Sequence, residues 1–169
     1  MEQIPIKYSK KNVSDIINLI SEYSKTYQKF EDFQDILLAS GDQKTGVIGE
    51  YYAALYIQKE FGVSTVYSKS NSEHDIEYIH KNKTYKIQVK TVSAHSDTRT
   101  ISPIKNGDWS ELYLISLDKN FEPNGFWINT KQDLQFDDDG KISYVRMPKI
   151  TSKLKKGRID FTNNQINKL

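Results

Sequence analysis

Residues 74–92, with the sequence HDIEYIHKNKTYKIQVKTV, constrain the fold of this chain more than any other stretch. Residues 74–80 and 84–92 each alternate apolar with polar side chains, which is typical of half-buried β-strands. Lys81 and Asn82 lie between the two runs, and asparagine tolerates the positive φ of a tight turn. The pattern predicts a β-hairpin.

The length of the turn decides which side chains share a face of this hairpin. A two-residue loop places Asp75 opposite Gln88, with Lys90 two residues farther along the same face. Ile87 and Val89 then point to the other face, into a core. A four-residue loop would set Asp75 opposite Lys90 and keep the shared face, whereas a regular three-residue loop would separate these side chains.

A helix is predicted on the N-terminal side of the hairpin. It begins after Thr45, which can serve as its N-cap, and stops at Gly62, because glycine readily takes the left-handed conformation of a helix end. The apolar stripe of this helix covers about a third of the helical wheel and consists of Val47, Tyr51, Ala54, Leu55 and Phe61. Glu50 lies at the rim, where a carboxylate either faces across the edge of the core or is simply solvated.

The remaining predicted elements are shorter or less regular. Residues 12–39 are predicted to be helical, as one helix or two, before Ser40-Gly41. The others are a strand at 63–67, an irregular loop at 93–110, a strand at 112–117, a strand at 126–129 after a Pro123-Asn124-Gly125 turn, and a strand at 142–147. This order predicts an α/β protein of the α+β type, with a helix followed by a central mixed sheet.

The composition excludes several classes of protein. With 169 residues the chain fits a single domain with its own core. It has no apolar run long enough to cross a bilayer and no apolar signal-peptide core, so we expect a cytoplasmic protein without a membrane partner. The sequence contains no cysteine and three histidines, which excludes a cysteine-based zinc site and disfavours a histidine-rich one. Any bound metal must therefore be held by oxygen ligands.

Basic residues are concentrated near the end of the chain. Residues 141–169 hold eight lysines and arginines against Asp160 alone, whereas the whole chain carries a net charge of only +2. A basic segment after an acidic-leaning body suits a polyanionic partner such as nucleic acid, although a solvated lysine-rich surface explains it equally well.

Glu50, Asp75, Gln88 and Lys90 together offer three oxygen ligands and one cation. Magnesium is commonly held by one or two carboxylates, several waters and substrate phosphate, and manganese is expected to substitute for it. Such an ion activates water and neutralises a phosphodiester. Lys90 would orient or deprotonate that water, or hold the charge that grows on the phosphate in the transition state.

An acid on a helix, Asp75 on one strand and Gln88-x-Lys90 on the next resemble the PD-(D/E)xK nuclease superfamily, the restriction-endonuclease-like fold, in its Gln-x-Lys variant. The resemblance covers residues 45–117. It implies a catalytic core there, with residues 1–44 as an N-terminal helical extension and residues 118–169 as additional strands and a basic segment of the same domain. It also implies a DNA endonuclease with Glu50, Asp75, Gln88 and Lys90 as catalytic residues, the first three as metal ligands. An amide at position 88 predicts weaker metal binding than a carboxylate would give.

The predicted activity is magnesium-dependent hydrolysis of DNA, most economically by a small type II-like restriction endonuclease that acts as a homodimer and cuts two strands with two copies of one site. Homing, resolvase, repair and defence nucleases remain alternatives, because fold and motif do not choose the substrate. So does a non-catalytic nucleic-acid-binding module with a degenerate metal site, and so does an ordinary ion pair between Lys90 and an acid.

Positive side chains in the loops flanking the hairpin are the predicted contacts to the DNA backbone. They are Lys69, Arg99 and Lys105. Trp109 and Trp127 are predicted to lie in the core rather than to stack on bases.

Overall fold

The computed structural model describes residues 4–6, 10–31, 44–67, 73–96, 98–143, 145, 159 and 161–169. Its elements are β1 (Ile4–Ile6), α1 (Lys10–Glu31), α3 (Lys44–Phe61), β2 (Thr65–Tyr67), β3 (Ile76–His80), β4 (Lys83–Ser93), β5 (Ile104–Lys105), β6 (Glu111–Leu117), β7 (Pro123–Thr130), η1 (Lys131–Asp133), β8 (Lys141–Ile142) and η2 (Ile166–Lys168). Within this described part, neither α-helix has the apolar length that a membrane span requires.

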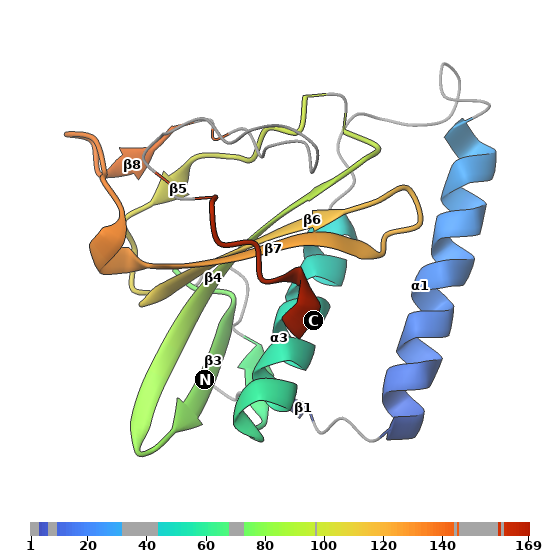
Figure 1. Cartoon of the computed structure of the whole chain (residues 1–169), viewed down its shortest axis with the longest axis horizontal. Coiled ribbons are helices and arrows are strands. Elements are labelled where there is room, and N and C mark those ends of the chain that lie inside the picture. Colours follow the sequence, from blue (N-terminus) through green and yellow to red (C-terminus); the bar gives the residue numbers. More distant parts are fainter. Residues whose placement is uncertain are drawn as a thin grey trace.

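Six strands form one mixed sheet in the order β1-β2-β3-β4-β6-β7 (Figure 1). β4 and β6 run parallel, and every other neighbouring pair in this sheet is antiparallel. Parallel neighbours are usually joined through a helix, but the described residues between them, 94–96 and 98–110, form an irregular excursion that contains β5, which pairs with β8. The molecule is an α+β protein with a helix followed by a mixed sheet, as the sequence predicts.

The hairpin of β3 and β4 has the predicted two-residue loop. His80 pairs with Lys83, and the antiparallel register continues from that pair to the beginning of β3. Lys81 and Asn82 have φ values of 51° and 60°, as both central residues of a type I′ turn require. This turn type matches the right-handed twist of the strands, and it fixes the register on which the candidate site depends.

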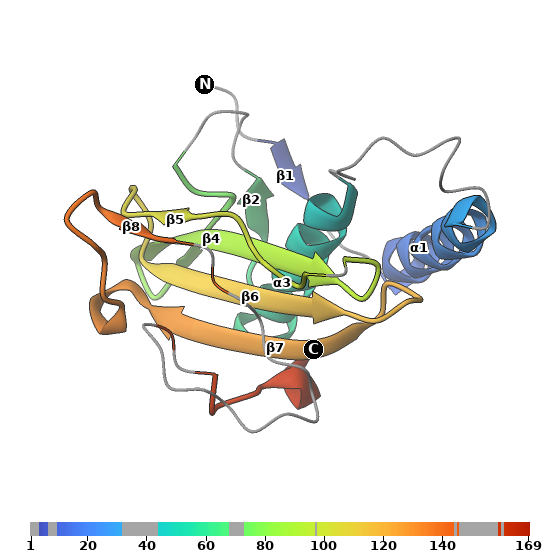
Figure 2. The same ribbon diagram turned by 90° about the horizontal axis from the view of Figure 1, so that it is seen from above.

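α3 packs against one face of the sheet (Figure 2), over Ile87 and Val89, which are buried as predicted. Apolar side chains nearly surround this helix, and the buried ones are Ile48, Tyr51, Tyr52, Ala53, Ala54, Leu55, Tyr56 and Ile57. The prediction for Val47 is wrong, since its side chain is 64% exposed. At 100° per residue it lies opposite Tyr56, which packs on the aromatic rings of β6 and β7. Thr45 is also not the N-cap, because the helix already includes Lys44.

The other face of the sheet carries a second core. Leu112 and Leu114 of β6 pack there with Val92 of β4 and with both tryptophans. Trp109 and Trp127 are 4% and 3% exposed, which confirms their predicted place in the core. The sheet is therefore covered on both faces, and polar side chains on its central strands are drawn out of bulk water.

Two predictions for the C-terminal half are wrong in detail. Residues 123–125 lie inside β7, and the turn comes earlier, where the Asp118 carboxylate accepts hydrogen bonds from the backbone N–H groups of Asn120 and Glu122 at 2.7 and 2.9 Å. An aspartate that caps its own loop in this way competes with a Pro-Asn-Gly turn signal. The strand predicted at 142–147 is only the two-residue β8, and residues 144, 146 and 147 lie outside the described part.

α1 stands beside the sheet and contacts it at the turn between β6 and β7 (Figures 1 and 2). Phe121 of that turn is fully buried, and its ring centroid lies 5.4 Å from Tyr23, 5.7 Å from Tyr27 and 5.0 Å from His95. The Ser24 hydroxyl donates to the Lys119 carbonyl at 3.1 Å. The helix ends at Glu31, and residues 32–39 of the predicted helical segment are outside the described residues.

Candidate active site

β4 is longer than its neighbour β3, and the difference creates an open strand edge. β3 begins at Ile76, which pairs with Ile87. Residues Gln88 to Ser93 of β4 continue beyond that pair, and among the described strands they pair only with β6 on their other side. Backbone groups that face the open side must find other partners, because an unpaired N–H in a partly buried site is costly.

The Asp75 side chain takes the place of the missing strand at this edge. Its Oδ2 accepts a hydrogen bond from the backbone N–H of Val89 at 2.7 Å and another from the Gln88 side-chain amide. The Asp75 backbone N–H in turn donates to the Ile87 carbonyl at 2.8 Å. The predicted meeting of Asp75 and Gln88 is thus confirmed, and the carboxylate is held against the open edge of β4.

Glu50 reaches this region because α3 approaches β4 very closely. A Cβ atom built on Gly49 would lie 1.8 Å from Thr91 Oγ1 and 2.8 Å from Thr91 Cβ, so only glycine fits. Gly49 immediately precedes Glu50, and Thr91 immediately follows Lys90. Contact between these neighbours brings the acid on the helix and the lysine on the strand into one region.

Burial disfavours the charge of both carboxylates, and Asp75 further disfavours the charge of Glu50. Burial, and then the nearby Asp75, raise the pKa of Glu50 from 4.5 to about 7, against the opposing influence of Lys90. Burial also raises the pKa of Asp75, although the Val89 N–H, Lys90 and His74 all act to lower it. Both acids are half-buried. The influence of Asp75 and Lys90 on Glu50, and of Lys90 on Asp75, places the three side chains in one electrostatic cluster.

Lys90 is half-buried, and within the described residues no ion pair joins it to Glu50 or Asp75. That arrangement differs from an ordinary structural ion pair, in which the ammonium nitrogen would contact a carboxylate oxygen directly. The lysine instead adds positive charge to the cluster without neutralising either acid by contact. Its charge therefore remains available to a substrate.

The cluster suits a hard divalent cation. Two half-buried carboxylates whose charges repel are stabilised by a cation between them. No cluster of three or more His, Cys, Asp or Glu side chains that could hold a metal exists in the described part of the chain. A metal here would therefore be held by Glu50, Asp75 and the Gln88 amide oxygen, completed by water or phosphate. The Gln88 nitrogen now faces Asp75, and a half-turn of the amide would present the oxygen instead.

The predicted DNA contacts are not part of this cluster in the described residues. Lys69 lies outside the described residues. Arg99 is half-buried and donates from Nη2 to the Ser116 hydroxyl at 2.8 Å, so its guanidinium is at least partly used within the fold. Lys105 is exposed on β5, and its carbonyl accepts the Trp109 indole N–H at 2.9 Å. Of the two that the structure describes, Lys105 is the one that presents an exposed cation.

Sequence reasoning missed the contribution of Gly49 and Thr91. A glycine in the interior of a helix costs stability relative to alanine, so it indicates a packing reason. The signal was therefore present at the residue before Glu50. Thr91 carries no comparable signal, because a threonine on a strand is ordinary.

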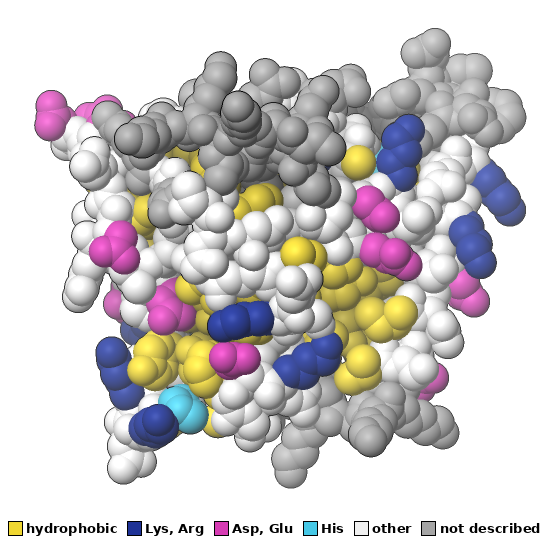
Figure 3. Space-filling view, in the orientation of Figure 1, with side chains coloured by type: hydrophobic (Ala, Val, Ile, Leu, Met, Phe, Trp, Pro, Cys, Tyr) yellow, Lys and Arg dark blue, Asp and Glu magenta, His cyan; other side chains and the backbone are white. Residues whose placement is uncertain are grey.

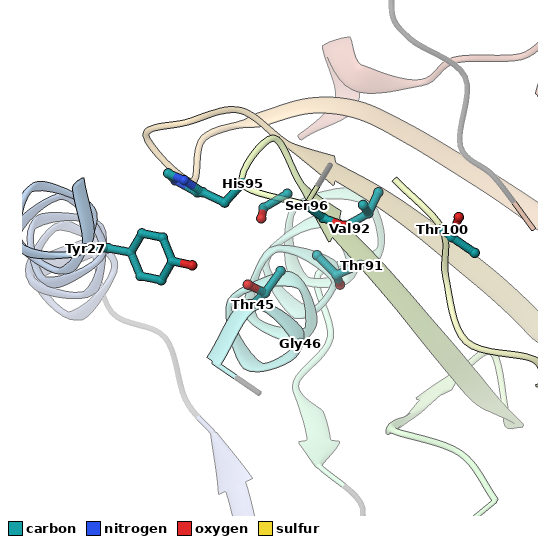
Figure 4. A pocket seen from close by; sticks show the side chains of 9 residues that line it. Tyr27, Thr45, Gly46, Thr91, Val92, His95, Ser96 and Thr100 are labelled. Carbon is teal, nitrogen blue, oxygen red and sulfur yellow. The ribbon is translucent and has the colours of Figure 1, made fainter. Parts of the chain in front are cut away.

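A cavity of about 340 Å³ lies at the first turn of α3 (Figure 4). It is lined by Tyr27, Thr45, Gly46, Thr91, Val92, Ser93, His95, Ser96 and Thr100. In Figure 4 the Tyr27 ring points from α1 toward the N-terminal end of α3, and Thr45 and Ser96 lie on the opposite side. Three separate elements thus bring polar groups to one space beside the carboxylate cluster.

No protein-family model matches this sequence, and a search of curated proteins gave no match. A solved structure to which the chain is similar is that of a bacterial homing endonuclease, I-Ssp6803I. The two share 16% sequence identity with a TM-score of 0.43, over 70% of this chain and 83% of that chain. Similarity at this level does not assign the chain to a family.

Proposed function

We propose that this chain is a magnesium-dependent DNA endonuclease of the PD-(D/E)xK type, in which Glu50, Asp75 and Gln88 bind the metal and Lys90 acts on the phosphate. One observation carries the proposal: Asp75 closes the open edge of β4 beside Gln88, and Glu50 and Lys90 share its electrostatic environment. An acidic pair with an adjacent unpaired lysine matches the needs of phosphodiester hydrolysis, which are a cation site and a nearby positive charge.

Each residue has a distinct task in this mechanism. When bound, the metal supplies an activated water and neutralises charge on the phosphodiester. Asp75 is held rigidly by the Val89 N–H, so its position costs little reorganisation. Lys90 orients the attacking water or holds the charge that develops on the non-bridging oxygens. Glu50 must be ionised to act as a ligand, and its raised pKa makes this step sensitive to pH near neutrality.

The biological role that we propose is that of a small type II-like restriction enzyme acting as a homodimer. A duplex has two strands to cut, and a symmetric dimer presents two copies of one site without a second domain. A neighbouring methyltransferase gene, together with a single sharp peak of twice the monomer mass, would support this role. A monomer that nicks one strand would contradict it.

The first test is cleavage of supercoiled and linear DNA with magnesium, with manganese and with a chelator. We expect cleavage that requires the metal, and a loss of at least about 100-fold in Lys90→Ala, because removing one charge that stabilises a transition state has an effect of this size. Lys25→Ala is the matched control, since it removes an exposed lysine from α1, at a position with no role in the proposed site. Absence of cleavage on every substrate, or equal cleavage by Lys90→Ala, would overturn the proposal.

One observation favours a second candidate, a DNA-binding module without catalysis. The Gln88 amide nitrogen donates a hydrogen bond to Asp75. This bond partly satisfies a carboxylate that would otherwise need a cation, and an amide at position 88 adds no negative charge of its own. In such a module the amide would keep this orientation and DNA binding would not depend on metal.

Gln88→Glu separates the two candidates. If the site binds metal, a third carboxylate should tighten manganese binding by about tenfold or more in calorimetric titration, because ligand charge sets affinity at such sites. Gln88→Leu should weaken it, since it removes the amide oxygen at similar volume. No manganese binding by either the wild type or Gln88→Glu, with DNA binding intact, would favour the module.

A further inference from the structure

The cavity at the first turn of α3 is directly adjacent to the candidate active site. Gly46 lines it, and Glu50 lies one helical turn farther along the same side of α3, about 6 Å in axial rise. Thr91 lines it as well and follows Lys90 on β4. A nucleic-acid strand that crosses the carboxylate cluster can therefore extend into this cavity without leaving the surface.

The described lining of the cavity is rich in hydroxyl groups. Six hydroxyl-bearing side chains line it, and the described lining residues include no Asp or Glu. The residues with hydroxyls are Tyr27, Thr45, Thr91, Ser93, Ser96 and Thr100. The first-turn N–H groups of α3 have no carbonyl partner within the helix, and its dipole favours negative charge at this end. These groups suit a ligand that offers only acceptor oxygens.

Thr91 gives a separate indication that something polar enters the cavity. It lines the cavity, and its Oγ1 is buried with no hydrogen-bond partner among the residues that the structure describes. Ser93 lines the cavity as well and is only 5% exposed. Buried hydroxyls are normally satisfied by protein, water or ligand. An unsatisfied buried hydroxyl at the wall of the cavity indicates a polar occupant.

We propose that this cavity binds the phosphodiester that neighbours the cleaved one on the same DNA strand. The inference rests on the proposed nuclease function and adds a second point of strand contact to it. One helical turn separates the cavity from Glu50, which is comparable with the spacing of successive phosphates along a strand. Neutral donors hold such a phosphate in place without adding much of the overall electrostatic affinity, so the cavity sets the register of the strand at the active site.

The test combines a protein change with a substrate change. The protein variants are Ser93→Ala and Thr45→Val, and Ser102→Ala is the control because Ser102 is exposed and does not line the cavity. The substrates are duplexes with a mapped cut, carrying a neutral methylphosphonate at the phosphate on either side of it. We expect each cavity variant to lower kcat/KM about tenfold on normal DNA, as loss of a hydrogen bond to a charged group does.

The same variants should lose almost nothing further on the duplex whose neutral linkage occupies the cavity. The proposal would be overturned if the losses from the protein change and from the methylphosphonate were additive on both duplexes. It would also be overturned if an abasic nucleotide caused a loss and a methylphosphonate did not, because the occupant would then be a base. Cleavage with additive losses overturns the cavity alone and leaves the nuclease intact. If the protein binds DNA without cutting it, the same cycle is read from Kd, and if it neither cuts nor binds, both proposals fall.

Discussion

Ionisation of Glu50 lowers the free energy of unfolding of this fold. Its pKa is raised from 4.5 to about 7, first by burial and then by Asp75. Between these two values the unfolded chain has released the proton while the folded chain retains it. The free energy of unfolding therefore falls as pH rises from about 4.5 to about 7, and the loss is complete above that range.

Glu50→Gln should consequently stabilise the metal-free protein at pH 8 and leave it nearly unchanged at pH 4.5. The full shift corresponds to about 3 kcal/mol, and partial solvent exposure reduces the expected gain to about 1–2 kcal/mol. Urea unfolding at both pH values measures it. Glu22→Gln, at an exposed position on α1, is the control and should change stability equally little at both. An equal gain at pH 4.5 and pH 8 would show that charge is not the cause.

The same variant should lose cleavage, because a neutral amide is a weaker ligand than a carboxylate. More stability with less activity is the expected sign for a residue kept for chemistry. Magnesium should raise the free energy of unfolding of the wild-type protein at pH 8, since a ligand that binds only the folded state stabilises it. Glu50→Gln should show little of this increase.

The contact between Asp75 and Gln88 could be predicted from the sequence, because a two-residue turn determines every pair along a hairpin. The hydrogen bond from the Val89 N–H to Asp75 could not be predicted, since it depends on where pairing between the two strands stops. β3 begins only at Ile76, so Val89 of β4 lies beyond the last pair of the hairpin. Whether Glu50 was solvated or functional was also undecided by its place at the rim of the helix. Only the approach of α3 to β4 settles its surroundings.

At the scale of elements, the packing of α3 on β4 depends on a single missing methyl group. Gly49→Ala should lower the free energy of unfolding by about 1–3 kcal/mol, because the added Cβ clashes with Thr91. It should also displace Glu50 and reduce cleavage more than stability alone explains. Thermal unfolding and kcat/KM measure the two effects.

Two variants make this prediction specific. Thr91→Ala in the Gly49→Ala background removes the two closest clashing atoms, at 1.8 and 2.7 Å, and should restore part of both quantities. Gly46→Ala lies on the same helix with no atom within 4 Å of its Cβ, so in thermal unfolding it should be neutral or stabilising. Because Gly46 lines the cavity, this variant is a control for stability and not for cleavage. If Gly49→Ala is as stable as Gly46→Ala, or cleaves like the wild type, the close approach does not position Glu50.

The elements that could be predicted are those with a strong local signal. The hairpin has a turn that favours one register, and α3 ends at Gly62, whose φ is 67°. The face that α3 buries could not be predicted, because apolar residues surround the helix and periodicity then gives no direction. The Pro-Asn-Gly sequence predicts the turn before β7 at the wrong place, because the Asp118 carboxylate caps its own loop earlier in the chain.

At the scale of the whole molecule, α1 is joined to the body through the aromatic cluster at Phe121 and through hydrogen bonds from Ser24 and Gln28 to the Lys119 carbonyl. On the face drawn in Figure 3, hydrophobic side chains gather between the positions of α3 and α1. Phe121 has a φ of 58°, which is unusual for a bulky residue, and it is fully buried. The surrounding packing must therefore hold it in that conformation.

Phe121→Ala should release α1 without unfolding the sheet. Amide hydrogen exchange in residues 10–31 should accelerate at least tenfold, while β4 and β6 exchange at nearly wild-type rates relative to global stability. Leu19→Ala is the control, because Leu19 lies on α1 with 62% of its side chain exposed. Uniform acceleration throughout the sheet would show that α1 and the body unfold as one unit. Since Tyr27 of α1 lines the cavity, this variant should also weaken strand binding there.

The hydrogen bonds at Asp75 have a consequence for how this site would change over evolutionary time. Position 75 has a structural role, since the Asp75 side chain accepts a hydrogen bond from the Val89 N–H just before β3 begins. A descendant that had lost catalysis would still be selected for an acceptor there, and aspartate or asparagine would persist as a relic. Glu50 and Lys90 have no such structural role among the described contacts. In any lineage of this chain, those two positions would be the first to drift once cleavage was no longer under selection.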